Sequence, residues 1–142
     1  MFKKVLVSGL VSLSIVSSVS ANGYDLKTNM TMLSATFSSV EQGFLTNDKK
    51  ATLKALDSFQ KEIDELLGDK KNIERLLPED LKHKSSMATN TATSIDKYID
   101  EIRVILKDKN MRMINRQNRS QKAFVNIQQQ YFRCHNMVRD WE

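Results

Sequence analysis

Four separate stretches of the chain carry apolar residues at alternating steps of three and four, and this spacing constrains the fold more than any other feature of the sequence. An α-helix turns once every 3.6 residues, so such a spacing draws one apolar stripe along a helix. We therefore expect a first helix over roughly residues 25–46, ended by Thr46-Asn47-Asp48, which also caps the next helix. Its stripe consists of Leu26, Met30, Leu33, Phe37, Val40 and Phe44.

The second and third stripes predict two further helices with a long connection between them. Gly68 can end the second helix in a left-handed conformation, and the stretch 68–86, which holds the single proline Pro78, is expected to contain about one helical turn. The second stripe consists of Leu53, Leu56, Phe59, Ile63, Leu66 and Leu67. The third helix is expected from about Ser86 to Lys107, and its inward-facing residues are Met87, Thr91, Ile95, Tyr98, Ile102 and Ile105.

A fourth helix is expected from about Met113 to the end of the chain, after a turn at Asp108-Lys109-Asn110. No strand-like alternation occurs, and four helices with one apolar stripe each can cover one another only by packing side by side. The sequence therefore predicts an all-α fold, an antiparallel up-down-up-down four-helix bundle. The fourth stripe consists of Phe124, Ile127, Tyr131, Cys134, Val138 and Trp141.

The first residues have the pattern of a secretory signal peptide. Lys3 and Lys4 precede an apolar run from Val5 to Val19, and Val19-Ser20-Ala21 offers small residues for cleavage. We expect residues 1–21 to be removed and residues 22–142 to form one exported, periplasmic domain. No second apolar run of that length follows, so no transmembrane anchor is expected in the mature chain.

The charge is mildly basic, with 22 Lys and Arg against 17 Asp and Glu. This excess is too small to indicate nucleic acid binding. Within residues 103–122, however, the only acid is Asp108. Such a cluster could steer an acidic redox protein or an anionic surface, or it could be a solvated loop and helix start. Its basic residues are Arg103, Lys107, Lys109, Arg112, Arg116, Arg119 and Lys122.

The only cysteine, Cys134, stands directly before His135. A lone cysteine in an exported protein can be a buried thiol, an intermolecular disulfide in a dimer, or a covalent attachment point. A catalytic Cys-His pair is disfavoured because adjacent residues on a helix point about 100° apart. A zinc site is disfavoured because the only other histidine, His83, lies in a charged connection and no further cysteine exists.

Haem attachment would explain why Cys134 and His135 are adjacent. In c-type cytochromes, Cys-x-x-Cys-His attaches the porphyrin by two thioethers and the histidine binds the iron. The corresponding residues run from Tyr131 to His135, with Tyr131 in place of the first cysteine. A single thioether at Cys134 or a non-covalent b-type haem is therefore compatible with the sequence.

The expected topology also indicates where a second iron ligand would lie. In an up-down-up-down bundle the first helix starts at the end where the fourth finishes, and His135 is roughly 10 Å from the C-terminus. Met30 lies at a similar depth in the first helix and faces inward, whereas Met32 is rotated about 200° away. Met30 is therefore the candidate second ligand, and the alternative is that it only packs in the core.

Two short motifs carry a family resemblance. Tyr24 to Leu33, YDLKTNMTML, resembles the opening of the cytochrome b(562) family of periplasmic four-helix haem proteins, and Cys134 to Arg139, CHNMVR, resembles the ending of the cytochrome c-prime family. The resemblance implies His135 as proximal ligand, Met30 as distal ligand, Cys134 as a thioether and Arg139 as partner of a haem propionate. Tyr131 and Val138 depart from the c-prime pattern.

The resemblance implies a function without substrate turnover, so no enzyme is expected. Methionine and histidine ligands imply electron transfer, and Met30 favours this role over the binding of nitric oxide or another gas, which is typical of c-prime proteins. The alternative from another class is a haem-free periplasmic helical bundle, a binding or chaperone-like protein, as a monomer or dimer.

Overall fold

The computed structural model describes residues 26–138, with the side chains of residues 28–136. The described part of the chain contains helices and short turns and no strand, so the predicted all-α class is confirmed. No helix within it is long and apolar enough to cross a membrane. The predicted signal peptide, Arg139 and Trp141 lie outside the described residues. The helices are α1 (Leu26–Leu45), α2 (Lys49–Leu67), α3 (Lys70–Leu76), the 3-10 helix η1 (Glu79–Lys84), α4 (Ser85–Lys107) and α5 (Met113–Val138).

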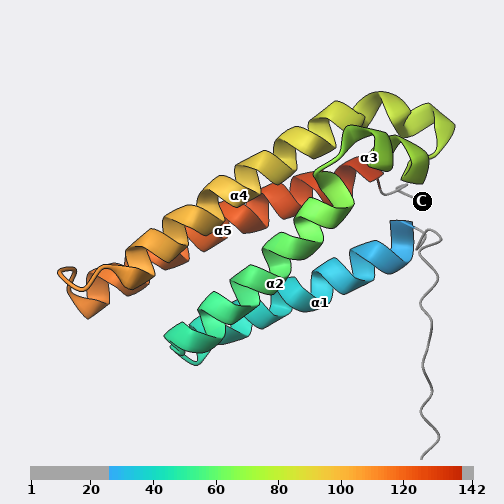
Figure 1. Ribbon diagram of the computed structural model, residues 1–142. Coiled ribbons are helices and arrows are strands. Elements are labelled where there is room, and N and C mark those ends of the chain that lie inside the picture. Colours follow the sequence, from blue (N-terminus) through green and yellow to red (C-terminus); the bar gives the residue numbers. More distant parts are fainter. Residues whose placement is uncertain (1–25, 139–142) are drawn as a thin grey trace, which may run out of the picture.

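The long helices form two antiparallel hairpins, α1 with α2 and α4 with α5 (Figure 1). The hairpins pack on each other through α2 and α4 and through aromatic rings of α1 and α5. The beginning of α1 and the end of α5 lie at the same end of the molecule, which also holds α3 and η1 (Figure 1). Both tight hairpin turns lie toward the other end.

The turn between α1 and α2 forms as the sequence predicts. Asn47 takes a positive φ of 53°, and the backbone N–H groups of Asn47 and Asp48 donate to the carbonyls of Phe44 and Gly43 over 3.1 and 3.0 Å. This is the Schellman arrangement that satisfies the last carbonyls of a helix. Asp48 then caps α2, because its Oδ1 accepts from the backbone N–H of Ala51 at 2.9 Å.

The prediction for residues 68–86 was wrong in two respects. This stretch folds into α3 and η1, because Asp69 caps α3 through the N–H of Lys71 and because Ile73 and Leu77 are buried in the core. Gly68 is right-handed, with φ −70° and ψ −27°, and continues the hydrogen bonding of α2 through the carbonyl of Asp64. A Cβ at Gly68 would collide with that carbonyl, so close backbone approach explains this glycine.

The predicted stripes supply most of the core. In α4 the inward face is wider than expected, because Ala88, Ala92 and Ile99 are also buried. Met87 and Tyr98, which were predicted to point inward, are only partly buried and pack against the edge of the core. Small residues on this face let α4 approach its neighbours closely, and neighbouring large side chains are displaced toward the rim.

Candidate functional site

Aromatic rings fix how α1 and α5 lie against each other. The ring of Phe37 stacks on that of Tyr131 with centroids 4.9 Å apart and an interplanar angle of 6°. The rings of Phe44 and Phe124 are 5.1 Å apart. The two contacts are seven residues apart on each helix, in opposite directions, so α1 and α5 run antiparallel in a regular register.

This register places Met30 at the same end of the molecule as His135. Met30 is seven residues before Phe37 and therefore lies at the level of Val138, about 4.5 Å along the helix axis beyond His135. The side chain of Met30 is 7% exposed and that of Met32 is 45% exposed. The predicted inward orientation of Met30 and outward orientation of Met32 are thus confirmed. That Met30 and His135 act as a ligand pair stays a prediction.

His135 lies on the side of α5 that faces α1. It follows Tyr131 by one helical turn, and the two rings are 4.5 Å apart. Because Tyr131 stacks on Phe37 of α1, this face of α5 is turned toward α1. Met30 in turn is two turns before Phe37, on the face of α1 that meets α5. Both candidate ligands therefore line the same α1–α5 contact, near the start of α1 and the end of α5.

The hydroxyl group of Tyr131 is buried in this region. Burial raises the pKa of Tyr131, and Ser34 on α1 is close enough to oppose that rise of the pKa. No group meets the geometry of a hydrogen bond to this oxygen, in the part of the chain that the structure describes. This hydroxyl stands at the position that replaces the first cysteine of the haem motif, and Ser34 is the side chain placed to bond with it.

The thiol of Cys134 lies among the core side chains, 3% exposed. Burial raises the pKa of Cys134 to about 11, so the thiol is neutral at ordinary pH. Of its three predicted fates, the intermolecular disulfide is disfavoured because the sulfur does not reach the surface. A buried thiol and an attachment point inside the fold are both compatible with this position.

Sequence reasoning missed one contact near the site. Arg133 reaches from α5 to α4, where its Nη2 atom lies 3.9 Å from the sulfur of Met87. Met87 is in the first turn of α4, at the same end as Met30 and His135. Its place on the apolar stripe could have indicated a second sulfur there, but only the packing of α4 on α5 brings it beside Arg133.

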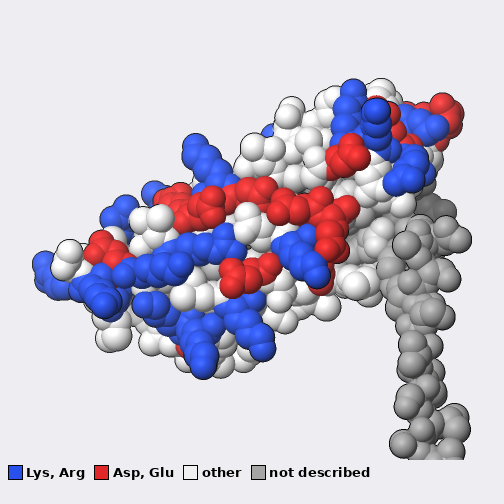
Figure 2. Space-filling view, viewed as in Figure 1, with Lys and Arg blue, Asp and Glu red and all other residues white. Residues whose placement is uncertain are grey.

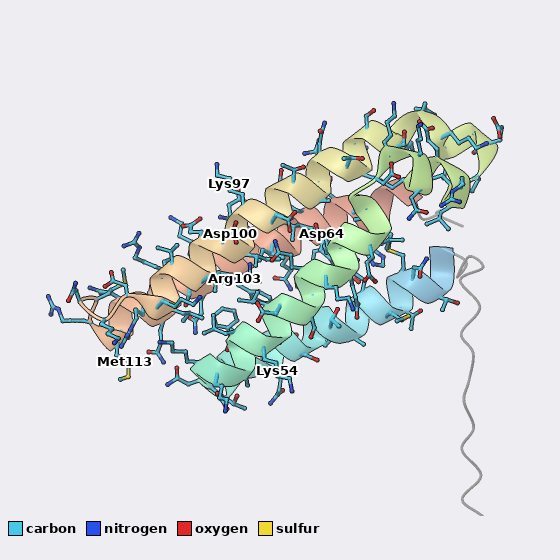
Figure 3. The ribbon with its side chains drawn as sticks, viewed as in Figure 1. Lys54, Asp64, Lys97, Asp100, Arg103 and Met113 are labelled. Carbon is cyan, nitrogen blue, oxygen red and sulfur yellow. The ribbon has the colours of Figure 1, made fainter. Side chains whose placement is uncertain are left out.

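A second polar cluster joins α2 to α4 near the middle of the molecule. Arg103 donates to Gln60 at 2.6 Å, to Asp57 at 2.6 Å and to Asp100 at 3.0 Å, and Gln60 donates to Asp96 at 3.1 Å. Arg103 and Asp100 lie on the side of α4 that faces α2, whereas Lys97 points away (Figure 3). Arg103 was predicted to belong to the basic cluster, but its charge is used within this network.

Burial and the negative charge of Asp64 raise the pKa of Asp96, against the opposing hydrogen bond from Gln60. No group of three or more acidic, His or Cys side chains in residues 28–136 is arranged to hold a metal ion. The α2–α4 network ties the two hairpins together.

A small cavity of about 40 Å³ lies far from the Cys-His pair, between the α1–α2 turn and α5, and is lined by Phe44, Asn47 and Ser120 among others. It has room for one or two waters and none for a cofactor.

Comparison with known proteins found no matching family model, no matching curated protein and no matching solved structure.

Proposed function

We propose that this chain is a periplasmic haem protein that transfers electrons and that its two hairpins form an up-down-up-down four-helix bundle around the cofactor's edge. The observation that carries the proposal is the register of α1 on α5. Met30 and His135 come from opposite ends of the chain, yet they line the same contact at the same end of the molecule.

The donor atoms suit a haem iron. In this proposal the imidazole of His135 and the thioether sulfur of Met30 would hold the iron, a ligand set that favours electron transfer over gas binding. Cys134 would supply one thioether, and Arg139, which lies outside the described residues, would pair with a propionate. Bound there, haem supplies a one-electron iron couple that no side chain of the protein can supply.

The remaining side chains of the site hold and shield it. The stacked rings of Phe37 and Tyr131 close the interior one turn below His135 and keep water from reaching the ligands through the core. The buried Tyr131 hydroxyl provides a hydrogen bond to a polar group of the ligand. The proposed role is that of an electron carrier, without turnover of a substrate.

A haem-free binding or chaperone-like bundle is the second candidate. It is favoured by the continuous aromatic packing of Phe37 against Phe59, Phe124 and Tyr131, with centroids 5.5, 5.1 and 4.9 Å apart. Such a core is closed over this length without a cofactor. The two candidate functions therefore differ in what lies at the last turn of the α1–α5 contact, beyond Tyr131: a haem in the first and packed side chains in the second.

The absorbance spectrum of protein purified from an exporting host tests the proposal. A Soret band, in the protein as isolated or after addition of haem, is expected. Replacement His135→Ala should abolish the band, whereas His83→Ala, which changes the exposed histidine of η1, should leave it intact. No Soret band in the unchanged protein under either condition would leave the haem-free bundle as the function.

Two further measurements resolve the ligands. Met30→Ala should convert a six-coordinate, low-spin spectrum to a high-spin one, and Met32→Ala should not. A spin change with Met87→Ala but not with Met30→Ala would assign the distal ligand to α4. After extraction with acidified acetone, colour that remains with the protein but is lost in Cys134→Ala shows a covalent bond at the thiol.

A further inference from the structure

The end of the molecule opposite to the Met30–His135 contact is formed by the two hairpin turns. We call this the tip and define it as residues 104–119 of α4 and α5 together with residues 45–50 of the α1–α2 turn. The turns are joined by a hydrogen bond of 2.7 Å from Gln117 to Asn47. The α4–α5 turn projects beyond the α1–α2 hairpin (Figure 1).

The tip is strongly basic. Its α4–α5 part has five basic residues and one acid, Asp108, and Lys49 and Lys50 lie beside them against Asp48. Lys and Arg side chains gather over this end, while acidic side chains form a band over α2 and α4 (Figure 2). The basic residues of the α4–α5 part are Lys107, Lys109, Arg112, Arg116 and Arg119, of which all but the half-buried Arg116 are exposed.

Both acids of the tip are used locally. Asp108 Oδ1 accepts from the backbone N–H groups of Asn110 and Met111 at 2.8 and 3.2 Å, which shapes the turn. Asp48 Oδ1 accepts from the N–H of Ala51 and caps α2. Their carboxylates are therefore held against the backbone, and no ion pair within the described residues joins them to the lysines and arginines of the tip.

Apolar side chains stand among these charges. Leu45 is 75% exposed, Val104 71%, Met113 64% and Ile114 57%, whereas the other exposed large apolar residues of the described part, Met32, Val125 and Phe132, lie outside the tip. Met113 points away from the helices at the tip (Figure 3). Single protruding apolar side chains surrounded by Lys and Arg are typical of a surface that enters the headgroup region of a membrane.

We propose that the tip docks this protein onto an anionic lipid surface, with Met113 and Ile114 entering the headgroup layer and Lys107, Lys109 and Arg112 contacting lipid phosphates. The tip projects and carries its apolar side chains singly on three helices. This shape fits a deformable lipid layer better than the flat, complementary surface of an acidic protein. Docking by the tip would leave the Met30–His135 end facing away from the lipid, and it does not depend on haem binding.

Co-sedimentation of the full chain with vesicles tests this proposal. We expect binding to vesicles of phosphatidylglycerol and phosphatidylcholine, little binding to phosphatidylcholine alone, and weaker binding as salt is raised. The triple variant Lys107→Glu, Lys109→Glu, Arg112→Glu should bind about 100-fold or more weakly, from the contribution of each basic residue at such a surface. The matched control variant replaces Lys70, Lys71 and Lys97 by Glu. It has the same net charge as the tip variant, and residues 1–25 are unchanged in both.

The apolar part of the contact has its own pair of variants. Met113→Ser with Ile114→Ser should weaken vesicle binding at high salt, where charge attraction is screened, and Met32→Ser with Val125→Ser should not. Equal loss in the tip and control charge variants would overturn the proposal. So would retention by immobilised polyglutamate without vesicle binding, which would assign the tip to an acidic protein.

Discussion

At Gly43, helix α1 lies so close to Thr52 of α2 that there is no room for a side chain. A Cβ at Gly43 would lie 2.6 Å from Oγ1 of Thr52, 2.8 Å from its Cα and 2.9 Å from its backbone N. Two of these atoms are backbone atoms of the first turns of α2. They cannot turn aside, because the carbonyl of Gly43 is itself bonded to Asp48 in the tight turn. Gly43→Ala should therefore push the two helices apart.

The sign of the stability change follows from two opposing terms. Alanine is favoured over glycine inside a helix by about 1 kcal/mol. Overpacking costs about 1–3 kcal/mol, and the upper part of this range, about 2–3 kcal/mol, applies here because two of the three close contacts are to backbone atoms. Gly43→Ala should therefore lower the free energy of unfolding by about 1–2 kcal/mol and the Tm by roughly 5–10 °C. The buried hydroxyl of Thr52, which donates to the carbonyl of Asp48 at 2.7 Å, would also be displaced.

Urea unfolding followed by far-ultraviolet circular dichroism measures this change. The control is Ala35→Gly at an exposed position of the same helix, which reports the helix preference alone and should cost about 1 kcal/mol. A Gly43→Ala protein that is as stable as the original, or more stable, would refute the close contact and with it the proposed spacing of α1 and α2.

Three other changes test separate parts of the structure. Asp96→Asn should stabilise the protein at neutral pH, because the pKa of Asp96 is raised in the folded state and its charged form is disfavoured there. The original protein should lose stability as the pH rises through that raised pKa, and the variant should not. Urea titrations at several pH values measure this difference. Asn47→Ala should lower the free energy of unfolding by about 1 kcal/mol, because alanine is strained at a φ of 53°, whereas Asn47→Gly should not; equal losses in the two variants would contradict the Schellman turn. Cys134 should react with an aromatic disulfide reagent at neutral pH only when urea unfolds the chain, because its pKa is about 11 and it is buried; rapid labelling of the folded protein would show that the thiol is accessible.

The helices were predictable because their signals are local. The spacing of Phe37, Val40 and Phe44 is enough to define a helix face, and Asp48 is a helix cap by chemistry alone. The two short helices between α2 and α4 were missed for the opposite reason. The apolar positions in residues 70–84 are too few to show a period, and Ile73 and Leu77 become helical core only because α2 and α4 lie beside them.

The orientation of the candidate ligands was also predictable. Met30 and Met32 differ by two positions, and the helical period alone sends one inward and the other outward, as their exposed fractions bear out. The identity of the groups near Met30 was not predictable to the same degree. That Phe37 stacks on Tyr131 and that Arg133 reaches Met87 depends on the register between helices far apart in the chain.

The fate of the basic residues shows the same division. From the sequence, Arg103 belongs with Lys107 and Arg112, since all lie in a stretch with a single acid. In the folded protein Arg103 is one helical turn from Lys107 but faces α2, and it pairs with Asp57 of α2 and with Asp100 of α4. Lys107, Lys109 and Arg112, at the projecting α4–α5 turn, stay exposed to solvent.

The sequence by itself determined the four long helices, most of their inward-facing residues and the placement of the start of α1 at the same end of the molecule as the end of α5, because helical period and antiparallel hairpins follow from local spacing and short turns. Tertiary structure alone decided which side chains touch across the helices: the aromatic stack below His135, the burial of Cys134 and the network around Arg103. Those contacts depend on how closely each pair of helices approaches and at what register. Both are set by the volumes of all the core side chains together, and no single stretch of sequence contains that sum.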